Sequence, residues 1–218
     1  IIKTMFGQTP NETAHWIYYV TFTNNFDFIK HGLPDASVLG VLWSVAIEEQ
    51  FYLIWPILLY ILPKNKYWIA FTTIIAGSLI FRSIYIDNPA MLENHTFSCM
   101  GDLATGAMGA WLINENNRFR CFITNLKKSM ISILYVLFIA VFLFRKELLM
   151  SISTIRIFER EFIAIIILFI IAEQCFAQNS LFKMKNLKLP SQLGIITYGL
   201  YCLHFIGILI TINITRML

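Results

Sequence analysis

Residues 42–62 read LWSVAIEEQFYLIWPILLYIL, a stretch of membrane-spanning length that carries two adjacent carboxylates, Glu48 and Glu49, in its first half. About 20 predominantly apolar residues cross the hydrocarbon core of a bilayer as a helix. A charged side chain at the centre of such a helix costs about 2.5 kcal/mol or more on insertion scales. We therefore expect the two acids to face a protein interior, a cavity or a reaction centre, and they mark this helix as a candidate functional site.

The rest of the chain is also unusually apolar. Of its 218 residues, 57% are hydrophobic and 14% are charged, whereas soluble domains are about 45–50% apolar and about 25% charged. The apolar residues gather in blocks of membrane length, which predicts an all-α, polytopic transmembrane helical bundle in a single membrane domain over residues 1–218. We place about six spans at residues 43–62, 67–86, 97–113, 130–144, 161–178 and 194–214. A short aromatic piece at 15–23 and a loop at 24–41 precede them.

Net charge and cysteine spacing argue against other classes of protein. The formal net charge of +4 is modest, and the basic residues lie in short loops between apolar blocks, a pattern of membrane topology rather than of nucleic-acid binding. The four cysteines show no CxxC spacing, so we interpret them as thiols in packed or lipid-facing positions rather than as disulfides or zinc ligands. We expect no metal among the site residues, and His15, His31 and His95 receive no role.

Polar and aromatic side chains of the first span share one helical face. Ser44 and Glu48 are four residues apart, as are Glu48 and Tyr52, and Trp43 lies beside them. Glu49 points about 100° away, toward another neighbour. A carboxylate here either accepts a hydrogen bond from a catalytic group or substrate hydroxyl, or forms a structural pair with an arginine. Two adjacent acids in one span favour the functional interpretation.

The last and third spans add further candidates. Tyr201 and His204 are three residues apart and share a face with Thr197, and histidine suits proton transfer near neutral pH. Taken alone, this histidine is more simply a hydrogen-bonded core residue. Asp102 has two balanced interpretations: it positions a ligand or catalytic group, or it pairs across a helix interface with Arg82 or a backbone donor.

Structural interpretations are preferred for the remaining polar and small residues of the spans. The small residues near Asp102, which include Gly101, Gly106 and Gly109, predict a close approach of helices. Arg82 and Glu173 lie near the ends of their spans and are expected to extend their charged groups to the membrane interface.

Three segments resemble motifs of the acyltransferase-3 family of polytopic bacterial membrane proteins. LWSVAIEEQFYLIWP resembles the family's W-S-[LV]-x-[IV]-E-E-Q-F-Y hallmark and matches at Trp43, Ser44, Glu48, Glu49, Gln50, Phe51 and Tyr52. HTFSCMGDLATGAMGAWL is more loosely similar to H-T-x-x-R-x-D-x-L-x-x-G through Asp102, with Leu103 and Gly106 each one position earlier, relative to this acid, than in the pattern. ITYGLYCLHF is similar to S-Y-G-I-Y-L-x-H-x through Tyr198, Gly199, Tyr201 and His204. The resemblance covers about residues 16–214.

This resemblance implies a multi-pass O-acyltransferase of the bacterial inner (plasma) membrane. Such enzymes transfer an acyl group, usually acetyl from acetyl-CoA, to a hydroxyl of a cell-surface carbohydrate such as lipopolysaccharide, exopolysaccharide or peptidoglycan. Acetyl-CoA is then a donor substrate and no cofactor stays bound. The implied partners are the lipid bilayer and a carbohydrate or lipid-linked glycan acceptor, without nucleic acid.

We expect the paired acids to act together with the last helix. Glu48 or Glu49 would orient the family's essential histidine, while His204, with Tyr201, would hold the acceptor or assist proton transfer. The catalytic candidates are Glu48, Glu49 and His204, and the substrate-binding candidates are Trp43, Ser44, Tyr52, Asp102, Tyr198 and Tyr201.

The chain departs from the family pattern in ways that leave two alternatives open. The family's essential histidine and an Arg-x-x-x-Arg pair lie upstream of Ile1, so we expect this chain to be the C-terminal portion of a longer protein. Without that histidine, the chain is not expected to be active by itself. Met100 and Thr197 stand where the family has arginine and serine. The alternatives are a transporter of polysaccharide or lipid-linked glycan, and an inactive truncated remnant.

Overall fold

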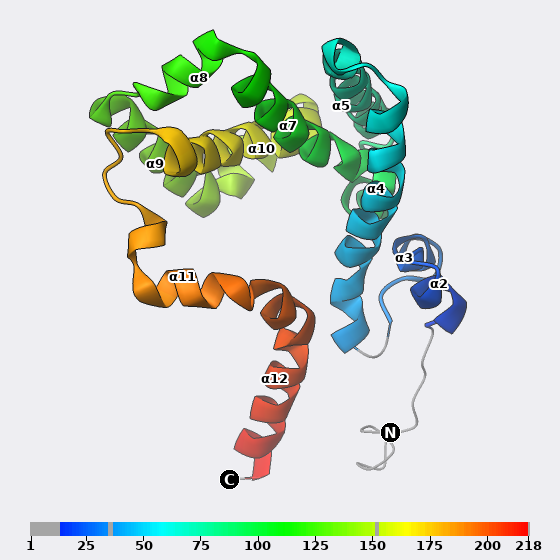
Figure 1. The fold of residues 1–218 in the computed structure, drawn as a ribbon. Coiled ribbons are helices and arrows are strands. Elements are labelled where there is room, and N and C mark those ends of the chain that lie inside the picture. The colour runs from blue at the N-terminus through cyan, green and yellow to red at the C-terminus, as the bar shows by residue number, and fades with distance from the viewer. Residues whose placement is uncertain (1–13, 35–36, 151–152, 218) are drawn as a thin grey trace. The chain divides into compact units, whose positions relative to one another are not determined.

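The computed structural model describes residues 14–34, 37–150 and 153–217, and within them the chain is helical, with no strand. The all-α fold class predicted from the sequence is therefore confirmed for this part of the chain (Figure 1). Its helices are α2 (Trp16–Val20), α3 (Asn24–His31), η1 (Ser37–Val41), α4 (Leu42–Ile61), η2 (Lys64–Lys66), α5 (Tyr67–Ile84), α6 (Pro89–Asn94), α7 (Thr96–Glu115), α8 (Asn117–Thr124), α9 (Lys128–Leu143), η3 (Lys146–Met150), α10 (Ser153–Phe176), η4 (Met184–Asn186), α11 (Lys188–Ile195) and α12 (Thr197–Met217).

Each of the first five predicted spans overlaps one long helix, and the sixth, 194–214, covers the end of α11 and most of α12. Fewer helices than this are apolar enough to cross a membrane. Among the described residues, two qualify by length and composition, over Leu39–Ile61 and Lys64–Ile84. A third is added if Asn117–Thr124 and Lys128–Leu143, which meet at 88°, form one broken span. The prediction of about six spans is therefore not confirmed.

Charged residues explain why α10 is not apolar enough to count as a membrane span. Four ionisable residues lie in its first three turns: Arg156, Glu159, Arg160 and Glu161. Two of these side chains, Arg160 and Glu161, bond to residues of α7 rather than facing lipid. The apolar residues of α10 predicted a helix correctly, but the composition of its first turns is that of a helix buried against protein.

Residues 1–54 with 188–218 form one compact unit, and residues 55–187 form a second. The boundary falls inside α4, directly before Trp55 and Pro56. The first unit contains α2, α3, the first part of α4, α11 and α12, and the second contains the helices between. The expectation of a single membrane domain over residues 1–218 stays a prediction.

The prediction of a loop over residues 24–41 is wrong for its first part, which forms α3. The polar residues Asn24, Asn25 and Asp27 are typical of turns, because their side chains compete for backbone hydrogen bonds. Here they are buried, and the Asp27 side chain accepts hydrogen bonds from outside its own turn. The helix ends at Gly32, whose φ of 84° suits a residue without a side chain.

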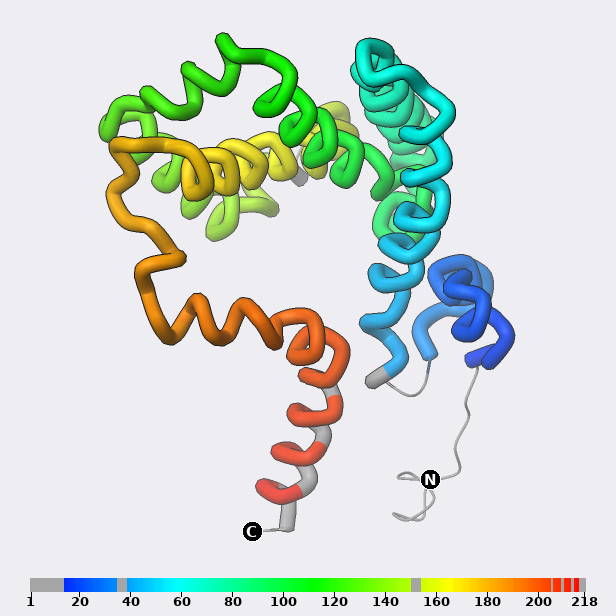
Figure 2. Tube along the Cα trace, viewed as in Figure 1, coloured from blue at the N-terminus to red at the C-terminus, as the bar shows by residue number. Residues whose placement is uncertain are grey.

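The second unit is built on α7, which packs against both α5 and α10. Its apolar clusters include Ile113, Ile123, Ile131 and Ala172, from α7, α8, α9 and α10. Figure 2 follows the chain through these helices. Large apolar side chains on the outer faces of α5 and α9, such as Ile80, Ile133 and Phe142, are exposed, as expected for helices that meet lipid.

Glycines permit the close packing of α10 on α7. A Cβ atom built at Gly101 would lie 2.0 Å from Glu161 Oε1, and one at Gly109 would lie 2.1 Å from Leu168 Cδ1. At Gly106 a Cβ would meet nothing within 4 Å. Close approach is therefore confirmed at Gly101 and Gly109, and the same prediction is wrong at Gly106, which faces outward.

Candidate functional site

The candidate site begins where α4 meets α12 within the first unit. The hydroxyl groups of Ser44 and Tyr201 share a short hydrogen bond. Ser44 Oγ also donates to the carbonyl of Val41, with an O···O distance of 3.3 Å. Because a serine hydroxyl has a single proton, Tyr201 must be the donor when Ser44 serves Val41. This arrangement joins the start of the acid-bearing helix to the last helix.

Glu48 and Glu49 follow Ser44 on α4, and both are half-buried. Glu49 lines a cavity of about 360 Å³ together with Gln50, Tyr52 and Leu53 of the same helix. The opposite wall comes from Thr21 and Phe22, in the turn between α2 and α3. The neighbour expected on the Glu49 side of α4 is therefore this turn, and Tyr52 shares the cavity with Glu49.

Gln50 fixes the turn against α4. Its Nε2 donates to the carbonyl of Phe22 at 2.6 Å and to Asn25 Oδ1 at 3.0 Å. Phe22 has a φ of 53°, a left-handed conformation that is uncommon for a residue other than glycine. The two hydrogen bonds of Gln50 help to hold this strained turn over the cavity. Gln50 was absent from the site predicted from the sequence, although it lies within the hallmark motif.

The remaining candidates of the first unit lie on α12. His204 Nδ1 donates to the carbonyl of Tyr201, and the two rings lie 5.8 Å apart. Since a carbonyl can only accept, this bond places the proton of a neutral ring on Nδ1 and the lone pair on Nε2. Tyr198, on the same helix, has an exposed side chain. Trp43 is partly buried, and Tyr52 is exposed.

Asp102 lies in the second unit and has a different partner from the one expected. It accepts hydrogen bonds from Nε of Arg160, at 2.8 Å, and from Nη2 of the same guanidinium. Pairing with Arg82 is therefore wrong as a hydrogen bond, because the fork of Arg160 on α10 occupies Asp102 Oδ2. Asp102 Oδ1 has no hydrogen-bond partner among the described residues. The partners that the structure describes for Asp102 belong to the second unit.

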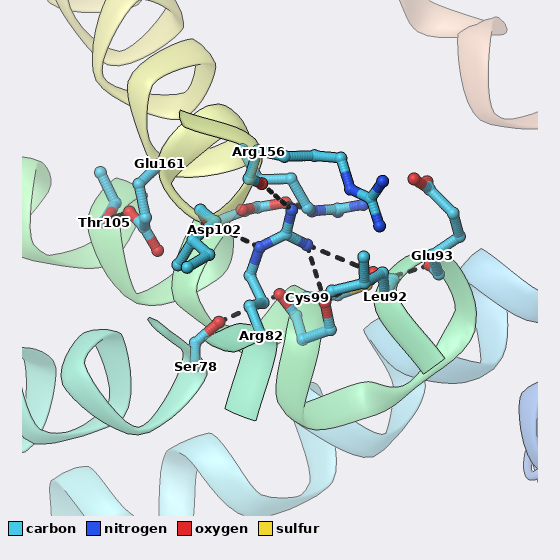
Figure 3. Close-up of polar contacts among 12 residues, drawn as sticks. Ser78, Arg82, Leu92, Glu93, Cys99, Asp102, Thr105, Arg156 and Glu161 are labelled. Atoms are coloured by element: carbon cyan, nitrogen blue, oxygen red, sulfur yellow. Dashed lines mark hydrogen bonds and ion pairs between the residues drawn. The ribbon is translucent and has the colours of Figure 1, made fainter. Parts of the chain in front are cut away.

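Arg82 is buried rather than extended to the membrane interface, which corrects the expectation from its position. Its side chain is 1% exposed, and its nitrogens donate to four acceptors (Figure 3). Three are carbonyls, and the fourth is a hydroxyl: Ile157 O at 2.8 Å, Arg156 O at 2.8 Å, Leu92 O at 3.3 Å and Ser98 Oγ at 2.9 Å. Arg82 thus ties α5 to α7, to α10 and to the end of α6.

Glu173 is likewise buried, against expectation. It is fully inaccessible, and its Oε2 accepts a hydrogen bond from the phenol of Tyr135 at 2.9 Å and another from Gln174 at 2.9 Å. Elsewhere in this unit, Thr105 donates to Glu161 Oε2 at 2.6 Å. Sequence reasoning missed these pairs because their members come from helices whose neighbours a single sequence does not reveal.

Comparison with known proteins points in the same direction as the motifs. The chain is 28% identical over 208 aligned residues to a peptidoglycan O-acetyltransferase, OatA, of Listeria monocytogenes. The alignment covers 86% of this chain and 31% of the relative, so the chain spans about a third of that relative's length. No protein-family model and no solved structure matches the chain.

Proposed function

We propose that this chain is part of a membrane O-acetyltransferase that acts on a cell-wall carbohydrate. The observation that carries the proposal is the pair Glu48 and Glu49 on a membrane-length helix, joined to the final helix through Ser44 and Tyr201. The similarity to a peptidoglycan O-acetyltransferase supports the class of reaction and of acceptor. The expectation of a lipopolysaccharide acceptor has no comparable support.

The proposed reaction moves an acyl group from a thioester to a sugar hydroxyl. A base removes the acceptor's proton while the acceptor oxygen forms the new bond to the acyl carbon. The carbon–sulfur bond of the acyl-CoA breaks, CoA leaves as a thiolate, and the base passes the proton to the thiolate to give the free thiol. A carboxylate at Glu48 or Glu49 would orient that base, as the acid of a catalytic triad does. Donors such as the Tyr201 phenol would bind the acceptor or the developing oxyanion.

The cavity beside Glu49 supports a binding role for its lining residues. Tyr52 and Phe22 present ring surface next to a carboxylate and an amide, the mixture of apolar faces and few polar groups that is typical of ligand sites. We propose that Tyr52 and Trp43 contact the sugar and that His204, through Nε2, accepts a proton or hydrogen bond from the acceptor. Tyr198 and Asp102 remain proposed substrate-binding residues.

Transfer of labelled acetyl tests the function. Membranes that contain the full-length protein are incubated with [acetyl-14C]acetyl-CoA and peptidoglycan, and the glycan is then isolated. The proposal expects label in the glycan, released by mild base as an ester should be. Absence of label with peptidoglycan and with other surface glycans would overturn it. Movement of unlabelled glycan across the membrane without acetylation would instead indicate the transporter.

A further inference from the structure

His15, Asp27 and His31 form the one group among the described residues in which three potential metal ligands converge. Their ligand atoms all lie within 4.8 Å of one another. His15 comes directly before α2, while Asp27 and His31 stand one turn apart on α3, so the cluster closes the α2–α3 hairpin. Neither the motifs nor the proposed acyl transfer uses any of these residues.

Both imidazole rings point the same nitrogen at one carboxylate oxygen. His15 Nδ1 and His31 Nδ1 each lie 2.8 Å from Asp27 Oδ1, and the ring centroids are 4.7 Å apart. The other oxygen, Oδ2, accepts the backbone N–H of His15 at 3.1 Å. Asp27 is 3% exposed and is held in one orientation, whereas the two rings are 52% and 43% exposed. The cluster therefore combines a fixed carboxylate with an open path from solvent.

We propose that His15, Asp27 and His31 bind Zn²⁺, with water completing a tetrahedral site. Zinc takes histidine nitrogen and carboxylate oxygen at about 2.0–2.2 Å, so neighbouring ligand atoms in a tetrahedron lie about 3.3 Å apart. The two Nδ1–Oδ1 distances of 2.8 Å are about half an ångström shorter than this. Because the two rings are exposed, they can rotate to bring the ligand atoms to the spacing that the ion needs.

The protons can also be accommodated. In the hydrogen-bonded cluster each Nδ1 carries a proton, because a carboxylate only accepts. Binding through Nδ1 moves the proton of each neutral ring to Nε2, without changing the charge of either histidine. One carboxylate then neutralises half the charge of the ion. The bond from the His15 amide to Oδ2 would act as the outer-shell contact that orients a ligating carboxylate.

The zinc site would stabilise the wall of the Glu49 cavity. Asn25, on the same short helix as two of the ligands, is bonded to Gln50 of α4, and the Phe22 turn lies between the ligands in sequence. A metal bound by residues before and after the Phe22 turn would restrain the two ends of this strained turn. This inference does not depend on the acyltransferase proposal, because it rests on the hairpin alone.

Metal binding to the purified full-length protein in detergent tests the proposal. After treatment with EDTA and dialysis, ZnCl₂ is titrated by calorimetry, and bound metal is measured by elemental analysis. We expect one Zn²⁺ per chain, a higher unfolding temperature with zinc than with EDTA, and the visible absorption of tetrahedral cobalt when Co²⁺ is substituted. Mg²⁺, which prefers six oxygen ligands, should not produce these effects.

Three variants and one control locate the ion. His15→Ala and His31→Ala remove exposed rings, so these proteins should fold, and each should bind Zn²⁺ weaker by more than about tenfold, the smallest loss typical of an outer-shell change. Asp27→Asn should also lose the ion. His95→Asn removes another histidine but keeps an acceptor for the Phe97 N–H, which His95 Nδ1 caps at 3.2 Å, and should bind as the wild type does. Substoichiometric binding by the wild type, or equal losses in all four variants, would overturn the proposal.

Discussion

The hydroxyl of Ser44 in α4 and the phenol of Tyr201 in α12 share a hydrogen bond, although 157 positions separate them in the chain. This bond joins the helix that carries the paired acids to the helix that carries His204. Two motifs that are remote in the sequence therefore meet within one unit. It is the contact on which a shared site between them depends.

A double-mutant cycle measures this contact. Ser44→Ala and Tyr201→Phe should each lower the free energy of unfolding in detergent by about 0.5–1.5 kcal/mol, the net value of one hydrogen bond. The double variant should lose less than the sum, because the second substitution has no bond left to remove. Strictly additive losses, within about 0.3 kcal/mol, would show that the two hydroxyl groups do not interact.

Arg82 should be among the most sensitive positions of the second unit. Arg82→Met removes the hydrogen bonds of a buried guanidinium to the carbonyls of Leu92, Arg156 and Ile157, and a hydrogen bond to a charged group contributes about 1.5–3 kcal/mol. Arg118→Met, at an exposed arginine, should change stability by less than about 0.5 kcal/mol. Chemical denaturation of both variants checks the difference. Similar small effects at the two sites would contradict the buried network.

The packing of α10 on α7 predicts opposite effects at two glycines of one helix. Gly109→Ala drives a methyl group into Leu168 and should destabilise the protein by about 1–3 kcal/mol. Gly106→Ala meets open space and should stabilise the helix by up to about 1 kcal/mol, because alanine is the better helix former. Thermal unfolding of both variants is the measurement. A neutral or stabilising Gly109→Ala would mean that the two helices do not approach so closely.

The α2–α3 hairpin predicts how the stability of the metal-free protein, prepared with EDTA, depends on pH. Burial alone would raise the pKa of Asp27, but hydrogen bonds from the His15 amide and from the His31 and His15 rings outweigh it, so its pKa lies below the ordinary value. A lowered carboxyl pKa stabilises the fold fully above the unfolded value of about 3.9, and this stabilisation is lost as pH falls through the lower folded value.

Asp27→Asn should therefore flatten the acid limb of the stability profile. Unfolding followed by tryptophan fluorescence in EDTA between pH 6 and pH 2 should show a smaller loss of stability in the variant, with the difference confined to the region below the unfolded pKa. The same acid slope in both proteins would contradict the ionised, hydrogen-bonded carboxylate.

Much of the helical framework is predictable from the sequence, because apolar blocks of membrane length define helices by their own composition. The positions of α4, α5 and α7 follow in this way. The number of membrane spans does not follow from the sequence, because the charged residues of α10 are compatible both with packing against protein and with a helix outside the membrane. Helix α3 was missed because its polar residues are satisfied by His15 and Gln50, which are distant in sequence.

The candidate site was likewise predictable only in part from the sequence. Helical spacing predicts that Ser44, Glu48 and Tyr52 share a face of α4, and the motifs draw attention to α12. The contact of Tyr201 with Ser44 and the cavity that Glu49 shares with Phe22 depend on tertiary packing. The predicted partner of Asp102, Arg82 or a backbone donor, was wrong because the sequence does not show that α10 packs on α7 and brings Arg160 to this acid.

The central claim is that Glu48 and Glu49 serve acyl transfer, and the rate of acetylation by variants of the full-length protein tests it most directly. Glu48→Gln and Glu49→Gln keep the size of each side chain but remove its charge, and at least one should lower kcat/KM for transfer from acetyl-CoA to the glycan by about 10²-fold or more, as expected when a base loses its orienting acid. Glu115→Gln, at an exposed end of α7, is the matched control and should retain full activity. Wild-type rates in both Glu48→Gln and Glu49→Gln, at equal amounts of protein in the membrane, would contradict the account.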